Sequence, residues 1–275
     1  MAASATAGAP VAHHFDNLTQ QQQTVRFGMW VFLITEVLFF GGAFCAYTVY
    51  RIWFPREFEA GSAVLNVGIA SVNTFLLLTS SLTVTLAMRA CYVGDQKGVR
   101  NWLLATIVLG SAFLGLKFRE YYLDYEEGLI PSSRTELVRT TGSGEGVPGA
   151  DFREQPVFVG NYLKAAEEAE RQTGKSFVEE VNLTRVQLFF MFYYSMTGLH
   201  GLHMIVGIGL LIWQYVLASR GFFAYPGRYV YIEVMSLYWH FVDMVWMFLL
   251  PLLYLAGPHS WGQAAGQFRL AILGH

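Results

Sequence analysis

Five long apolar stretches limit what this chain can fold into more than any other feature of its sequence. A helix that crosses about 30 Å of hydrocarbon needs about 20 mostly apolar residues. Stretches that meet this requirement cover approximately residues 27–50, 63–88, 102–122, 186–217 and 229–255. Transmembrane β-barrels instead use segments of about ten residues that alternate in polarity, and these stretches are too long and too uniformly apolar for that pattern. The sequence therefore predicts an all-α membrane protein, a bundle of five transmembrane helices.

The composition agrees with a bilayer as the solvent. Hydrophobic residues make up 54% of the 275 residues and charged residues only 14%, against roughly 25% charged residues in ordinary soluble domains. A soluble globule of this length has too few interior positions to hide so much apolar surface. The formal net charge of −2 gives no overall field that would attract nucleic acid, so no nucleic-acid partner is expected.

The charges are concentrated in one segment between the third and fourth apolar stretches. Residues 124–184 contain 12 acidic and 6 basic residues, a net charge of −6. This distribution predicts one polar extramembrane insertion within a membrane protein. The expected organisation is a flexible amino-terminal segment, three membrane helices, the insertion, two membrane helices and a carboxyl-terminal tail. Their ranges are 1–25, 26–123, 124–184, 185–256 and 257–275. Inside the insertion, residues 162–171 favour a helix and residues 142–149 are rich in glycine.

The basic residues of the short loops predict the orientation, because such residues are in excess on the cytoplasmic side. The amino-terminal flank and the loops at 89–101 and 219–228 contain six Lys and Arg residues. The loop at 51–62 and the tail contain three. The count predicts a cytoplasmic amino terminus, with the insertion and the carboxyl terminus on the external, periplasmic side.

Polar side chains inside the apolar stretches are the candidate functional residues, because such groups are costly at membrane depth. The candidates are Glu36, Asn73, His200, His203, Glu233, His240 and Asp243. An unpaired carboxylate in hydrocarbon is unfavourable, so we expect Glu36 to have a polar neighbour, either His200 or His203. Its role, structural or functional, stays open.

The other candidates allow two interpretations each. Asn66, Asn73 and Ser80 recur every seven residues, a spacing typical of polar side chains that hydrogen-bond neighbouring helices together. His240 and Asp243 are either a structural pair or a proton-handling pair. Two histidines three residues apart, with a third on another helix, can form a metal site. The chain lacks HExxH, GxSxG, CxxC and CxxCH motifs, however, and we expect no metal, haem or catalytic residue in it.

The fifth apolar stretch carries YWHFVDMVWMFLL at 238–250, and the fourth carries TGLHGLHMIVG at 197–207. Both segments resemble signatures of the subunit III family of the haem–copper oxidases, the group that includes cytochrome c oxidase. FLITEVLFFGGAF at 32–44 and NTFLLLTSSLTVTLAM at 73–88 resemble two further family segments in the family's order. KFREYY at 117–122 resembles a fifth, although Lys117 or Arg119 stands where a neutral residue is expected. The short bacterial members, which lack the first two of seven helices, are the most similar.

The resemblance implies a non-catalytic subunit of a proton-pumping terminal oxidase in an aerobic respiratory chain of a bacterial inner membrane. Such a subunit has no catalytic site of its own and acts within an oxidoreductase that is also a translocase. Haem and copper lie in partner subunits. The subunit packs mainly on subunit I, with subunit II in the same complex. It stabilises subunit I, supports proton uptake and binds phospholipid. Glu36 matches the family's carbodiimide-reactive membrane carboxylate.

Three alternatives remain open at this stage. The chain could serve a quinol oxidase or a homologue associated with nitric oxide reductase. It could also be an independent proton-coupled transporter that uses Glu36, His200 and Asp243. The insertion of about 55–60 residues departs from the family pattern, and it is either a solvated cover or a contact surface for cytochrome c or an electron-supplying complex.

Overall fold

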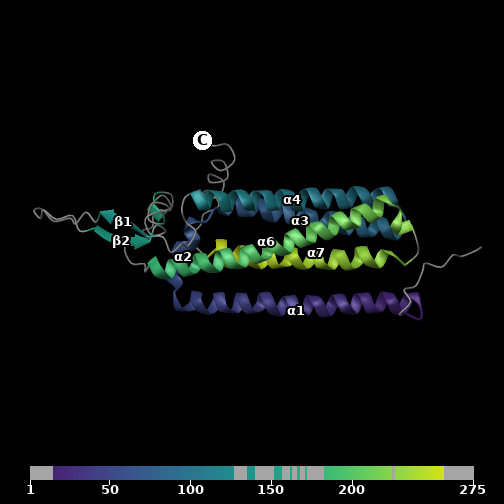
Figure 1. The fold of residues 1–275 in the computed structure, drawn as a ribbon, viewed down its shortest axis with the longest axis horizontal. Coiled ribbons are helices and arrows are strands. Elements are labelled where there is room, and N and C mark those ends of the chain that lie inside the picture. Colours follow the sequence, from purple (N-terminus) through teal and green to yellow (C-terminus); the bar gives the residue numbers. More distant parts are fainter. Residues whose placement is uncertain are drawn as a thin grey trace, which may run out of the picture. The chain divides into compact units, whose positions relative to one another are not determined.

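The computed structural model shows a predominantly helical chain (Figure 1). The ranges that it describes are 15–126, 135–139, 152–156, 162, 166–167, 171, 183–224 and 227–256. The helices and strands are α1 (Leu18–Trp53), α2 (Pro55–Val64), α3 (Val67–Val93), α4 (Gln96–Glu126), β1 (Thr135–Arg139), β2 (Phe152–Pro156), α6 (Leu183–Ser219), a 3₁₀ turn (Phe222–Ala224) and α7 (Tyr229–Leu249). A π-helical turn, Leu250–Tyr254, continues α7.

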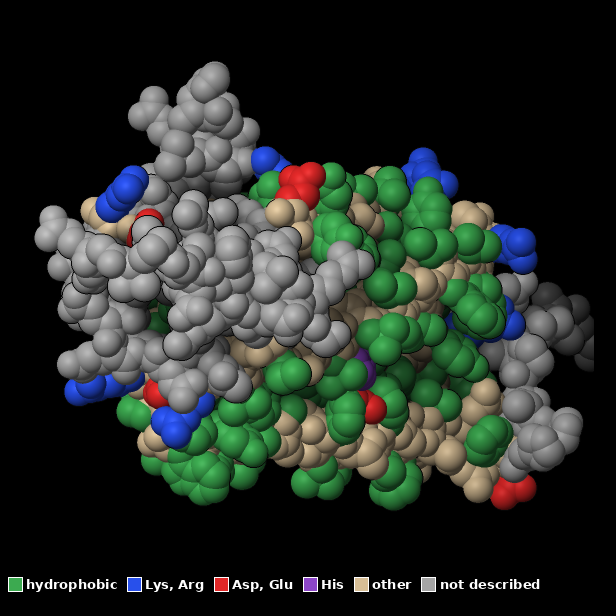
Figure 2. Space-filling model, turned by 60° about the vertical axis from the view of Figure 1, so that its left-hand side comes forward, with side chains coloured by type: hydrophobic (Ala, Val, Ile, Leu, Met, Phe, Trp, Pro, Cys, Tyr) green, Lys and Arg blue, Asp and Glu red, His purple; other side chains and the backbone are tan. Residues whose placement is uncertain are grey.

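The prediction of five membrane-spanning helices is confirmed. In the part of the chain that the structure describes, α1, α3, α4, α6 and α7 with its π turn are long and apolar enough to cross a bilayer. The face shown in Figure 2 is dominated by hydrophobic side chains where its residues are described, and exposed apolar side chains such as Phe27, Leu38 and Trp213 occur on these helices. A helix surface of this kind matches a hydrocarbon solvent.

Two boundaries differ from the sequence-based expectation. Helix α1 begins at Leu18 instead of near residue 27, and the Asn17 side-chain oxygen accepts the Gln20 backbone N–H at 2.8 Å. An asparagine cap of this kind satisfies an amide at a helix start, and residues 18–25 are part of α1. The expected loop at 51–62 contains most of α2, which begins at Pro55. Proline suits the first helical position because it has no N–H to leave unpaired.

The chain divides into two compact units, and each is described separately. Unit 1 contains residues 1–46, 71–115 and 197–248, and unit 2 contains residues 47–70, 116–196 and 249–275. Each of the five long helices contributes a segment to both units.

Two buried tryptophans of α7 organise the core of unit 1. Trp239 donates its indole N–H to Ser80 on α3, and Trp246 donates to Thr74, both at 3.0 Å. A Cβ added at Gly110 would lie 2.8 Å from the Trp239 ring, and one at Gly207 would lie 3.0 Å from it. Glycines at these positions on α4 and α6 therefore leave the space that the large indole occupies.

Aromatic rings fill the core of unit 2. Tyr47, Phe58 and Phe189 are fully buried, and their rings contact one another with centroids 5.3–6.5 Å apart. A Cβ added at Gly61 on α2 would overlap the Phe189 ring. The hydroxyl of Tyr47 donates to the Leu252 carbonyl in the π turn. Aromatic packing and one hydrogen bond thus fix α2 and the π turn within this unit.

The insertion contains an element that the sequence did not predict. Strands β1 and β2 pair antiparallel, with Thr135 opposite Pro156 and Arg139 opposite Phe152. Of the helix expected at 162–171, the described residues 162, 166, 167 and 171 are helical, and Tyr162 and Ala166 are buried. The Tyr162 ring packs on Phe190 of α6, and burial raises the pKa of its phenol well above the ordinary value. Residues 142–149, 1–14 and the tail from 257 lie outside the described ranges.

Candidate functional site

The Glu36 carboxyl of α1 pairs with the His203 imidazole of α6 in unit 1. His203 Nε2 lies 3.1 Å from Glu36 Oε2, and the two side chains are 16% and 18% exposed. The expected neighbour from the fourth span is therefore His203 and not His200. The Leu199 carbonyl lies 2.9 Å from His203 Nδ1.

That carbonyl determines how protons are placed in the pair. Because a carbonyl can only accept, Nδ1 of His203 carries a proton. The contact between Nε2 and Glu36 then needs one further proton, which belongs either to the carboxyl or to the ring. Glu36 and His203 therefore hold one proton between them, and the pair can exist as a neutral acid with a neutral imidazole or as an ion pair.

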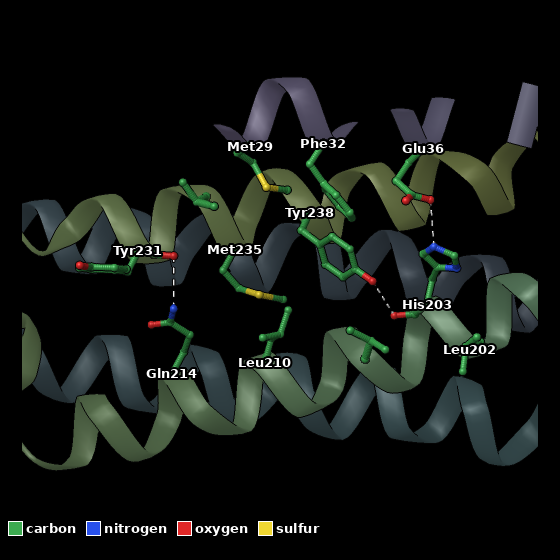
Figure 3. Close-up of a pocket in the computed structure, with 12 residues that line it drawn as sticks. Met29, Phe32, Glu36, Leu202, His203, Leu210, Gln214, Tyr231, Met235 and Tyr238 are labelled. Carbon is green, nitrogen blue, oxygen red and sulfur yellow. Dashed lines mark hydrogen bonds and ion pairs between the residues drawn. The ribbon is translucent and has the colours of Figure 1, made fainter. Parts of the chain in front are cut away.

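A pocket of about 420 Å³ adjoins this pair in unit 1, between segments of α1, α6 and α7 (Figure 3). Its walls are mainly apolar, from Met29 and Phe32 of α1, Leu210 of α6 and Met235 of α7. Two hydrogen bonds brace its sides. The Tyr238 hydroxyl donates to the His203 carbonyl at 2.9 Å, and the Gln214 amide donates to the Tyr231 carbonyl at 3.3 Å. A pocket with this lining suits a hydrocarbon chain.

His240 makes a second polar group in unit 1, between α7 and α3. Its Nδ1 lies 2.6 Å from the Ser81 hydroxyl and its Nε2 lies 3.2 Å from the Thr85 hydroxyl. Asp243, one turn further along α7, is almost completely buried. Both ring nitrogens of His240 thus contact hydroxyls of α3.

The remaining candidates lie apart from Glu36. The His200 ring is buried beside the rings of Phe113 and Trp246, with centroids 5.7 and 5.4 Å away. Asn73 is fully buried on α3. Glu233 accepts a hydrogen bond from Arg26 at 2.8 Å and is only partly buried.

Among the seven candidates, the described contacts join Glu36 to His203. Within the described ranges, no group of three or more His, Cys, Asp or Glu side chains is arranged to hold a metal ion.

Sequence reasoning missed a deeply buried ion pair, which lies in unit 2. Lys117 and Glu120 of α4 are 3.0 Å apart, and their side chains are 7% and 6% exposed. A signal was present, because opposite charges three residues apart share one face of a helix and here interrupt an apolar stretch.

Comparisons with known proteins bear out the family resemblance. The family model described as cytochrome c oxidase subunit III matches residues 9–125 and 183–258. The chain is 29% identical over 233 residues to cytochrome c oxidase subunit 3 of Thermostichus vulcanus, covering 83% of this chain and 85% of the relative. It is 25% identical over 251 residues to cytochrome bo(3) ubiquinol oxidase subunit 3 of Pseudomonas aeruginosa, covering 90% and 92%. It is 26% identical over 239 residues to quinol oxidase subunit 3 of Bacillus subtilis, covering 84% and 86%.

The matched ranges also separate the insertion from the rest of the chain. The first matched segment ends at residue 125, one residue before α4 ends at Glu126. The second begins at residue 183, where α6 begins at Leu183. Residues 126–182 lie outside the match. The spans are thus the part of the chain that resembles the family.

Proposed function

Because the chain belongs to the cytochrome c oxidase subunit III family, we propose that it is the non-catalytic subunit III of a proton-pumping terminal oxidase. The observation that carries this proposal is the family match over all five membrane helices. The partners are subunit I, as the main contact, and subunit II, which together hold the haem and copper. The chain is a multi-pass membrane protein, and we place it in a bacterial inner membrane with its amino terminus in the cytoplasm.

The pocket beside Glu36 and His203 supports a role in stabilising the complex. We propose that it takes an acyl chain of a membrane phospholipid, because its walls are apolar and its polar atoms are largely engaged with one another. A lipid chain there would fill the space that α1, α6 and α7 leave within unit 1. In this role the shared proton of Glu36 and His203 keeps the pair neutral beside hydrocarbon, where a net charge would be costly.

Copurification tests the proposed function directly. A tagged chain should purify with a haem-bearing partner, and substitution of His200, His203 and His240 by Gln should leave the haem spectrum of that complex in place. An independent transporter would instead purify as a self-contained unit without haem. A haem signal that disappears with any of these histidines, although the partner subunits still copurify, would assign a ligand to this chain and contradict the proposal.

The electron donor is decided by a second measurement. Relatives named for cytochrome c oxidases and for quinol oxidases both match, and we favour cytochrome c. Turnover of the purified complex with reduced cytochrome c, but not with a quinol, is the expected result. Copper ligands in the subunit II sequence should accompany it. The opposite substrate preference would assign the chain to a quinol oxidase.

The acidic insertion offers a surface for a basic donor, because opposite charges raise association rates at low salt. Deletion of residues 140–174 separates this role from a passive cover. If the insertion binds the donor, the deletion weakens the apparent affinity at low salt and has little effect at high salt. An unchanged affinity at both salt concentrations leaves only the cover.

A further inference from the structure

Four side chains of unit 2 form a buried polar group that the proposed function does not use. Lys117 and Glu120 lie on α4, Tyr193 lies on α6, and Tyr254 is the last residue of the π turn. All four residues are at most 6% exposed. Ionised groups are seldom buried to this extent unless they are paired and hydrogen-bonded. The hydrogen bonds among these four side chains therefore determine whether their burial is favourable.

The donors and acceptors of this group balance. The ammonium of Lys117 donates to Glu120 Oε2 at 3.0 Å, to the Tyr254 hydroxyl at 2.7 Å and to the Tyr193 hydroxyl at 3.2 Å. Both tyrosine hydroxyls donate to Glu120 Oε1 at 2.7 Å. Three N–H groups therefore meet three acceptors, and the carboxylate accepts three hydrogen bonds. A charged ammonium with an ionised carboxylate satisfies this count.

Aromatic rings complete the surroundings of the ammonium. Lys117 Nζ lies 5.3 Å from the ring centroids of Tyr121 and Tyr193 and 5.4 Å from that of Tyr254. The rings of Tyr193 and Tyr254 meet the ammonium through their hydroxyl edges, at 3.2 and 2.7 Å from Nζ, so the face of the Tyr121 ring is the one that adds a cation–π attraction. A carboxylate, two hydroxyls and one further ring thus converge on one nitrogen atom from α4, α6 and the π turn.

We propose that Glu120, Tyr121, Tyr193 and Tyr254 form a binding site for a primary ammonium group, which the chain fills with its own Lys117. We call these four residues the ammonium site. The ligand is the Lys117 side chain of α4, and Tyr193 of α6 and Tyr254 of the π turn bind it. The lysine therefore acts as a tethered ligand that holds three segments of unit 2 together, and a variant without it should accept a small alkylammonium ion from solution.

Chemical rescue tests this site in the intact membrane complex that the chain purifies with. Lys117→Ala should lower the midpoint of thermal dissociation by more than about 5 °C, because an unpaired buried carboxylate is costly. Added n-propylammonium chloride should restore at least half of this loss with a saturable dose dependence. Tetramethylammonium chloride at the same concentration should not, because it has no N–H to donate. The matched control is Lys97→Ala, since Lys97 is exposed, and neither salt should affect it differently from the unaltered chain.

Two results would overturn the proposal. One is a Lys117→Ala complex as stable as the Lys97→Ala complex. The other is a response to n-propylammonium that equals the response to tetramethylammonium. If Lys117→Ala does not assemble, Lys117→Met, Glu120→Gln and their combination provide the test. The double variant should be more stable than either single variant, because it leaves no unpaired charge, and a double variant that is less stable than both would contradict the site.

Discussion

Units 1 and 2 accommodate polar side chains within apolar helices in different ways. In unit 1 the buried contacts include pairs of neutral groups, such as the indole of Trp239 and the hydroxyl of Ser80, and the Glu36–His203 pair is partly exposed beside a pocket. In unit 2 the Lys117–Glu120 pair is almost fully buried and has every N–H of its ammonium engaged. The comparison indicates that deep burial of charge requires a complete set of partners.

The difference has a physical basis in where protons can move. Glu36 and His203 share one proton and can become neutral together. The loss of a hydrogen-bond partner of this pair therefore costs little stability. Lys117 and Glu120 are buried more deeply, and removal of either leaves the other without its partner. Substitutions at matched positions of the two units test this difference.

The largest effect is expected from neutralising one carboxylate in each unit. Glu120→Gln should destabilise the purified complex by about 3–5 kcal/mol, because it leaves the Lys117 ammonium with no counter-charge. Glu36→Gln should cost less than about 1 kcal/mol, because the Gln amide can still donate to His203 Nε2. Denaturant titrations of the two complexes measure the difference. Equal losses would mean that the two units do not differ in the way described.

A smaller loss of stability is expected when a glycine that contacts an aromatic ring is replaced by alanine in either unit. Gly61→Ala should cost about 1–3 kcal/mol, because its Cβ would overlap the Phe189 ring in a core already filled by rings. Gly110→Ala should cost less, because its closest contact is the outer edge of the Trp239 ring at 2.8 Å. Thermal dissociation of both variants tests the order. Gly28→Ala is the control, since nothing lies within 4 Å of its added Cβ.

The smallest effect is expected from two ion pairs whose arginine side chains are at least partly exposed. Arg26 pairs with Glu233 at 2.8 Å in unit 1, and Arg185 pairs with Glu57 at 3.3 Å in unit 2. Such pairs contribute at most about 1 kcal/mol. Arg185→Ala should cost slightly more than Arg26→Ala, because the Arg185 guanidinium also lies 4.4 Å from the Phe54 ring centroid. Stability measured at low and high salt separates the charge from the ring contact, and a larger loss for Arg26→Ala would reverse the order.

The spans could be predicted from the sequence because hydrocarbon imposes a simple rule on length and polarity. The rule weakens at the ends, where polar residues such as the glutamines after Asn17 continue α1 into the region expected to be loose. The same rule did not predict α2, because the stretch from Pro55 to Val64 is short and polar. The position of α2 depends on contacts between rings such as Phe58 and Phe189.

The candidate site could be predicted only in part. The cost of a membrane carboxylate predicted a histidine partner for Glu36, and helix geometry decided in favour of His203 over His200. Lys117 and Tyr254 are 137 residues apart in the sequence, and no local pattern brings Tyr193 and Tyr254 to Lys117. Tertiary packing alone brings these tyrosines to the lysine. From the sequence, therefore, only the charge pair on α4 could be recognised.

The contacts between α4 and α6 in unit 2 also explain how the chain tolerates its insertion. Lys117 donates to Tyr193, and the Tyr194 hydroxyl donates to Asp124 at 3.0 Å. Hydrogen bonds therefore join the carboxyl-terminal part of α4 directly to the amino-terminal part of α6. The entropy of closing a loop grows only with the logarithm of its length, and each doubling costs about 0.6 kcal/mol. Lengthening a connection of about seven residues to residues 127–182 takes about three doublings, or about 2 kcal/mol. The membrane helices can therefore keep their pairing while the segment between them changes in length and acquires a function of its own.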